Sequence, residues 1–152
     1  MTEQPALTAL QASGLEHEIV RHGPVNSLDE AAAARGVDPG SVIKTMVVRR
    51  ADDDYFFVLV PGERTIAWPK LRRLLGASRL SMPDAATARA VTGYERGTIT
   101  PFGAIRAWPV VADERISGRT VSIGAGALGV SATVRGDALV DVLDATVADV
   151  TA

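Results

Sequence analysis

The residue that most suggests chemistry is Lys44, which lies inside the apolar run from Ser41 to Val48. Lys44 and Lys70 are the only lysines among the 16 basic residues, so arginine carries nearly all of the positive charge. An ammonium group within such a run loses hydration unless an anion meets it. One interpretation is that Lys44 binds an anionic group of a ligand. The alternative is a lysine whose stem covers apolar surface or a sheet edge while its ammonium stays in water.

A second candidate is the loop from Gly93 to Gly103, which holds three glycines and one proline in eleven residues. Glycine lets a backbone approach a ligand closely and adopt positive φ angles, and proline stiffens the turn. Backbone N–H groups in such a loop can hold a carbonyl or phosphate oxygen, as an oxyanion hole does. The alternative is that Gly93 ends a helix and the rest is an ordinary surface loop.

Composition excludes several other kinds of chemistry. The chain has 152 residues, a formal net charge of -2 and no cysteine, which excludes disulfides, thiolate metal sites and cysteine nucleophiles. Its two histidines, His17 and His22, are too few for a histidine-rich metal site, and we expect neither a metal nor another cofactor. The N-terminus lacks a signal-peptide pattern, and no apolar run approaches the roughly 20 residues of a membrane span. We expect a soluble, cytoplasmic protein.

Local signals predict the elements that must position these residues. Ser27 and Glu30 form a capping box that opens an alanine-rich helix. Residues 52–54 turn the Lys44 strand back into an apolar strand at 55–60, which makes a hairpin. Further helices are predicted at 4–13, 69–75, 84–92 and 136–143, and further strands at 16–22, 107–112, 119–124 and 130–135. This order shows no regular βαβ alternation, so it predicts a single α+β domain over residues 1–152, built on a mixed, curved sheet.

The spacing within the glycine-rich loop resembles a known family signature. Gly-x-x-x-Pro at 97–101, preceded by Thr-Gly-Tyr and continued as Pro-Phe-Gly, is similar to the loop of the YbaK/EbsC family, also called the prolyl-tRNA-synthetase-associated editing domain. The similarity covers roughly residues 15–150, and further segments follow in the family's order: 22–25, 36–37, 43–48, 60–62, 70–76, 110–113 and 122–124. The resemblance implies a barrel-like core surrounded by helices and hydrolysis of the ester between a wrong amino acid and a tRNA.

The resemblance also implies roles for individual residues. Lys44 matches the family's functional lysine and would bind phosphate or ribose oxygens of the terminal adenosine. The backbone around Gly97 would hold the ester carbonyl, and Pro101 and Phe102 would shape a small amino-acid pocket. Asp113 would contact the substrate's α-ammonium, although as a residue of a turn before Gly118 it fits equally well. The full set of expected substrate-binding residues is Thr45, Tyr94, Thr98, Thr100, Pro101, Phe102, Gly103 and Asp113.

A basic segment offers a surface for the rest of the tRNA. Arg64, Lys70, Arg72 and Arg73 lie close together in the sequence, with Glu63 as the acid beside them. We interpret them as contacts to the tRNA backbone, which would make binding depend on salt. The alternative is a solvated face, which is the usual meaning of a run of charges.

The expected function is therefore a trans-acting aminoacyl-tRNA deacylase. An aminoacyl ester is already activated and has a vicinal hydroxyl beside it, so a site that positions it needs no protein nucleophile. Family members that clear alanine tend to have a histidine in the later strands, and this chain has none after His22. That difference favours Cys-tRNA(Pro), or another small amino acid on tRNA(Pro). Prolyl-tRNA synthetase is a candidate partner, and both monomer and dimer stay open. Two other hypotheses are a catalytically silent tRNA- or nucleotide-binding module and a hydrolase of a small metabolite.

Overall fold

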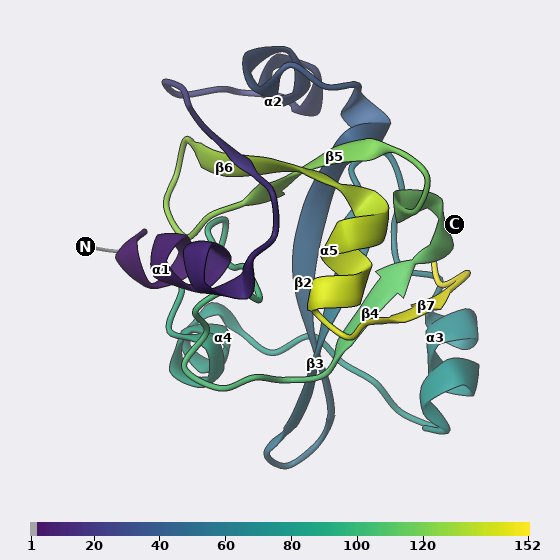
Figure 1. The fold of residues 1–152 in the computed structure, drawn as a ribbon. Coiled ribbons are helices and arrows are strands. Elements are labelled where there is room, and N and C mark those ends of the chain that lie inside the picture. Colours follow the sequence, from purple (N-terminus) through teal and green to yellow (C-terminus); the bar gives the residue numbers. More distant parts are fainter. Residues whose placement is uncertain (1–2) are drawn as a thin grey trace.

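The computed structural model describes residues 3–152 and is centred on a long hairpin (Figure 1). Strand β2 (Val42–Ala51) and strand β3 (Asp54–Pro61) pair antiparallel, with Lys44 opposite Val60. Asp53 turns the chain with a positive φ of 54°. The predicted hairpin is confirmed.

The hairpin lies inside a mixed sheet of seven strands. The other strands are β1 (Glu18–Arg21), β4 (Val110–Asp113), β5 (Thr120–Gly124), β6 (Val130–Arg135) and β7 (Thr146–Ala148). The order across the sheet is β1-β6-β5-β2-β3-β4-β7. The β5–β2, β3–β4 and β4–β7 pairs are parallel, and the other pairs are antiparallel.

Both faces of the central strands are buried, and this explains the unbroken apolar run of β3. Successive residues of a strand point to opposite faces. Phe57 and Leu59 therefore pack into one core cluster, while Phe56, Val58 and Val60 pack into a second. A parallel neighbour and a buried position on both faces are typical of such continuous apolar strands.

Within residues 3–152, five helices lie around the sheet. They are α1 (Gln4–Ser13), α2 (Leu28–Arg35), α3 (Trp68–Leu75), α4 (Ala85–Thr92) and α5 (Gly136–Val142), and two 3-10 turns lie at Pro39–Ser41 and Glu114–Ile116. Leu10 of α1 and Leu139 of α5 pack into the first cluster, whereas Leu71 of α3 packs into the second. In Figure 1, α5 crosses in front of the sheet and α3 stands beside β7. The hydroxyl of Ser27 accepts from the Glu30 N–H at 3.1 Å, as the capping box predicts.

The α+β class and the mixed sheet are confirmed, and two details of the fold differ from prediction. The strand expected at 107–112 begins at Val110. The residues after the last helix contain strand β7, which was not predicted. In strand order β1 and β7 are the outer strands, so closure into a barrel stays a prediction. So does a single domain over 1–152, of which Met1 and Thr2 lie outside the described residues. None of the helices within 3–152 combines the length and apolar character needed to cross a bilayer.

Candidate functional site

A gap in the pairing of β2 creates the main hollow beside Lys44. Strand β5 pairs with β2 only at Val42 and Ile43, and the next partner on that side of β2 is Ser81, which exchanges two backbone hydrogen bonds with Arg49. Between these points lies a cavity of about 470 Å³ that runs along β2 from Val42 to Val47. Helix α4 and the loop that follows it form the opposite wall.

The register of the hairpin shows which backbone groups face this cavity. Arg49 bonds to Ser81 and the Phe57 N–H donates to the Pro109 carbonyl, so both point away from the β2–β3 ladder. In an antiparallel pair this orientation recurs at every second residue. The N–H and C=O groups of Thr45 and Val47 therefore point away from β3, toward the cavity. The Thr45 hydroxyl is itself buried and has no hydrogen-bond partner among the described residues.

Lys44 lies where this cavity meets a second hollow. The Lys44 side chain is half-buried, and its Nζ donates to the carbonyl of Arg64 at 2.8 Å. Burial lowers the pKa of this ammonium from its ordinary value. The second hollow, of about 440 Å³, is lined mainly by apolar side chains, among them Met46, Ile66 and Trp68. Among the described residues the only recorded partner of this cation is a neutral carbonyl, so it is well placed to meet an anion.

Gly97 of the glycine-rich loop lines the same cavity as Lys44. Its φ is 89°, in the left-handed region that favours glycine. Gly97 lies in a turn from Glu95 to Thr98. The N–H and the hydroxyl of Thr98 close this turn, since both donate to the Glu95 carbonyl, at 2.9 and 2.7 Å. Lys44, Thr45 and Gly97 are thus the sequence-predicted site residues that the fold brings together around one cavity.

The other predicted loop residues support the loop and do not line the cavity. Tyr94 is buried and its hydroxyl donates to the Phe102 carbonyl at 2.7 Å, and burial raises the pKa of Tyr94 to about 12. Phe102 packs into the first core cluster, and Gly103 lies against the backbone of Pro5, which leaves no space for a Cβ. Thr98, Thr100 and Pro101 also lie outside the cavity lining, and Thr100 is fully buried.

Asp113 lies at the end of β4, and its carboxylate is occupied by internal partners. It accepts from the N–H of Arg115 at 3.1 Å, the N–H of Val150 at 3.2 Å and the hydroxyl of Thr151 at 2.8 Å. Arg115 also forms an ion pair with it at 3.2 Å. Burial raises the pKa of Asp113, but the hydrogen bonds from Arg115, Thr151 and Val150 outweigh burial and hold it below its ordinary value. These contacts give Asp113 a structural role, and it does not line the cavity.

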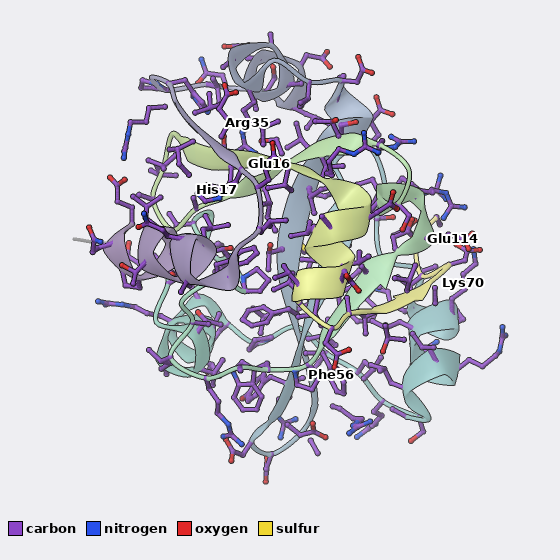
Figure 2. The ribbon with its side chains drawn as sticks, viewed as in Figure 1. Glu16, His17, Arg35, Phe56, Lys70 and Glu114 are labelled. Atoms are coloured by element: carbon purple, nitrogen blue, oxygen red, sulfur yellow. The ribbon has the colours of Figure 1, made fainter. Side chains whose placement is uncertain are left out.

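The basic segment divides into two parts. Arg64 donates to the Thr151 hydroxyl at 2.6 Å, and Lys70 donates to Asp149 at 2.8 Å, so both hold the C-terminal stretch. Hydrogen bonds from Lys70 and Arg115 lower the pKa of Asp149 to about 2. Arg72 and Arg73 form the last turn of α3 and have no carboxylate within ion-pair distance in the described part of the chain. Figure 2 shows Lys70 beside α3, well away from Arg35.

Two charged residues of the cavity lining were missed by the sequence analysis, Arg35 and Arg96. Arg35 ends helix α2, where a basic residue is common because it interacts favourably with the helix dipole. Arg96 precedes Gly97 in the loop, and its position there was the one available signal. No Asp or Glu within residues 3–152 lines this cavity, so Lys44, Arg35 and Arg96 make it positively charged.

The chain is similar to several known proteins. The family model of the aminoacyl-tRNA editing domain matches residues 22–142. A proline–tRNA ligase of Desulforamulus reducens is 35% identical over 103 residues, which are 63% of this chain and 18% of the ligase. EbsC of Enterococcus faecalis, a proposed Cys-tRNA(Pro)/Cys-tRNA(Cys) deacylase, is 24% identical over 126 residues, covering 82% of this chain and 77% of EbsC. The chain thus spans less than a fifth of the ligase's length.

A solved structure shares the fold. The crystal structure of a proposed trans-editing enzyme for prolyl-tRNA synthetase superimposes with a TM-score of 0.89 at 24% identity. The superposition covers 99% of this chain and 97% of that one. At this identity the likeness concerns the fold alone. The family match confirms the resemblance predicted from the loop and the Lys44 strand.

Proposed function

Because the chain belongs to the aminoacyl-tRNA editing domain family, we propose that it acts in trans to hydrolyse the ester of a mischarged tRNA. The substrate we propose is Cys-tRNA(Pro), or tRNA(Pro) carrying another small amino acid. The observation that carries this proposal is that Lys44, whose ammonium donates to the Arg64 carbonyl, and Gly97 line one cavity. The similarity to EbsC, which covers most of both chains, supports the choice of amino acid and the action in trans.

The reaction is an ester hydrolysis at the end of the tRNA. Water attacks the carbonyl carbon, the bond from that carbon to the ribose oxygen breaks, and a proton passes to the ribose oxygen. The vicinal hydroxyl of the ribose can position the water or accept its proton, so the protein need not supply a nucleophile. Backbone N–H groups near Gly97 and Thr45 would hold the carbonyl oxygen as negative charge develops on it.

Lys44 positions the terminal nucleotide in this scheme. The Arg64 carbonyl holds its ammonium in place at 2.8 Å, and the ammonium keeps further N–H donors for ribose or phosphate oxygens. Its half-buried position strengthens such contacts, because electrostatic interactions are larger where water is partly excluded. Lysine suits this role as a compact point charge.

The amino-acid side chain would rest on the apolar wall of the cavity. Val47, Ala88 and Ile99 contribute to this wall, and no histidine follows His22 in the sequence. A small, apolar wall admits cysteine or alanine but recognises them weakly, because one methylene is worth only about 1–3 kcal/mol in such a pocket. We propose prolyl-tRNA synthetase as the partner, because it would produce the mischarged tRNA(Pro) that this protein hydrolyses. This role would locate the protein in the cytoplasm.

A panel of charged tRNAs tests the proposal. Purified protein is incubated with labelled Cys-tRNA(Pro), Ala-tRNA(Pro), Ser-tRNA(Pro) and correctly charged Pro-tRNA(Pro), and release of the amino acid is followed against buffer alone. We expect rapid release of cysteine or another small amino acid and no release of proline. Binding of tRNA without release of any amino acid would favour the silent binding module. Turnover of small aminoacyl esters but of no charged tRNA would favour the metabolite hydrolase.

A further inference from the structure

The guanidinium of Arg35 has N–H groups that lack a hydrogen-bond acceptor within the described chain. It reaches from the end of α2 toward the sheet (Figure 2), and its Nη1 lies 3.5 Å from the Ser122 hydroxyl, which is long for a hydrogen bond. Its Nε is buried and has no partner among residues 3–152. A buried N–H without an acceptor is costly, so an oxygen of a ligand would relieve it.

The positive charge of the residues around Arg35 favours an anion as that ligand. The cavity that Arg35 lines also contains Lys44 and Arg96, and no carboxylate of the described chain lines it. Asp84 lies within electrostatic range of Arg96, but its carboxylate caps helix α4 by accepting from the Thr87 N–H at 2.8 Å. Three cationic residues thus line one hollow whose described lining includes no acidic residue. The Nε and Nη edge of a guanidinium matches two oxygens of a planar or tetrahedral anion.

The chemistry of the proposed substrate identifies the anion. In an aminoacyl-tRNA the carboxyl group of the amino acid is esterified, and its amino group is positive. The negative charges nearest the ester are therefore phosphates, and the nearest of these is the 5′ phosphate of the terminal nucleotide.

We propose that Arg35, assisted by Arg96, forms a phosphate subsite for the 5′ phosphate of the terminal adenosine, while Lys44 faces the ribose. The identity of this ligand rests on the proposed function, but the subsite itself is a property of the cavity. Both line the cavity, where Arg35 is half-buried and Arg96 is exposed.

Two small substrates that differ only in one phosphate test the subsite. They are 3′-O-cysteinyl-adenosine and the same ester carrying a 5′-monophosphate. For the wild-type protein we expect the phosphate to raise kcat/KM by about ten- to hundred-fold, the range for a hydrogen bond to a charged group. In R35Q this ratio should fall close to one, while kcat/KM for the phosphate-free ester stays within about two-fold. R35K should keep part of the ratio, because lysine retains the positive charge but lacks the paired N–H donors of a guanidinium.

The controls separate this role from a structural one. R135Q removes an equal charge from an exposed arginine outside the cavity, and its ratio should match the wild type. Because both substrates are measured on one protein sample, a misfolded fraction cancels from the ratio. An unchanged ratio in R35Q, or an equal loss on both substrates, would overturn the subsite.

A binding measurement keeps the subsite testable if neither ester is cleaved, which would instead count against the proposed function. Calorimetry would compare adenosine 5′-monophosphate with adenosine. Wild-type protein should bind the monophosphate about ten-fold or more tightly than adenosine, and R35Q should bind the two alike. Equal binding of the two by the wild type would overturn the subsite.

Discussion

In the proposed site, single residues would act through their backbone as much as through their side chains. Lys44 offers an ammonium, Thr45 offers peptide groups that its neighbour strand leaves free, and Gly97 offers a backbone in the left-handed region. The chain has no cysteine, and the proposed reaction would depend on the position of the ester and on the negative charge that develops on its carbonyl oxygen.

Gly97→Ala tests the contribution of the loop backbone. The nearest atom to an added Cβ would be Cδ2 of Leu128 at 3.8 Å, an ordinary contact, so the variant should fold. A φ of 89° strains alanine by about 1–2 kcal/mol, and relief of that strain would shift the N–H groups that hold the carbonyl. We expect kcat for deacylation to fall about ten-fold or more, and the melting temperature to fall by only about 2–8 °C.

Gly118→Ala is the matched control for this variant. Gly118 has a similar φ of 80° and open space around it, and it lies outside the cavity. It should lose similar stability and keep full activity. Equal activity losses in the two variants would mean that the Gly97 backbone has no special part in the reaction.

At the scale of elements, helix α3 begins beside Lys44 and carries two arginines in its last turn. Its first residue, Trp68, lines the second hollow together with Lys44, and Arg72 and Arg73 occupy its last turn. R72Q/R73Q should therefore raise KM for charged tRNA. In a plot of the logarithm of the tRNA association constant against the logarithm of the salt concentration, it should reduce the magnitude of the slope by about 1–2. The kcat should barely change, because backbone contacts are equal in the ground and transition states.

The double variant R119Q/R135Q controls for net charge, because both arginines are exposed and lie outside the Lys44 cavity. Its salt slope should equal that of the wild type. If R72Q/R73Q also kept the wild-type slope, α3 would be a solvated face and not a tRNA contact.

Elements with local signals were predictable, whereas elements that depend on distant partners were not. The caps at Ser27 and Asp84 are formed by neighbouring residues, so the helices they open were found. Strand β7 has three residues and pairs with β4, some 35 positions earlier in the chain, through contacts that no local pattern encodes. Strand β4 begins later than predicted, after Pro109, because proline has no N–H to donate to a ladder.

The same distinction applies to the site. Lys44 and Gly97 were found because a lysine in an apolar strand and a glycine in a dense loop are unusual in themselves. Arg35 was missed because an arginine at a helix end is ordinary, and only the packing of α2 against the sheet brings it to the cavity. Asp113 was expected near the substrate, yet its partners at Val150 and Thr151 follow from the course of the C-terminal stretch.

At the scale of the whole molecule, the C-terminal stretch (residues 149–152) connects strand β4 with the segment that follows β3. Thr65 exchanges two backbone hydrogen bonds with Ala152, and the Ala67 N–H donates to the Val150 carbonyl. Asp113 anchors the same stretch to β4. Arg64, whose carbonyl holds Lys44, also donates to Thr151. The position of the Lys44 ammonium therefore depends on contacts made near the end of the described chain.

Asp113→Asn tests this anchor through its pH dependence. The loss of a buried, fully hydrogen-bonded carboxylate should lower the free energy of unfolding by about 2–4 kcal/mol at neutral pH. The pKa of Asp113 is lowered in the folded state, so its contribution is present above the unfolded pKa of about 4 and is lost as the pH falls through the folded pKa. Urea unfolding at several pH values should thus show the difference from wild type shrinking below about pH 4.

Asp149→Asn provides the comparison, since Asp149 is a more exposed partner of Arg115 and Lys70. It should cost less stability than Asp113→Asn at neutral pH. A difference for Asp113→Asn that stays constant down to acid pH would show that its charge does not stabilise the fold.

The most direct test of the account is single-turnover deacylation of Cys-tRNA(Pro) by wild-type protein, Lys44→Ala and Lys44→Arg. We expect Lys44→Ala to unfold within a few degrees of the wild type and to lose about 100-fold or more in rate, because its only described hydrogen-bond partner is one carbonyl whereas its proposed substrate contact is charged. Lys44→Arg should also be poor, because a planar fork cannot replace a compact ammonium. Wild-type rates from a well-folded Lys44→Ala protein would contradict the central claim that this cavity is the deacylase site.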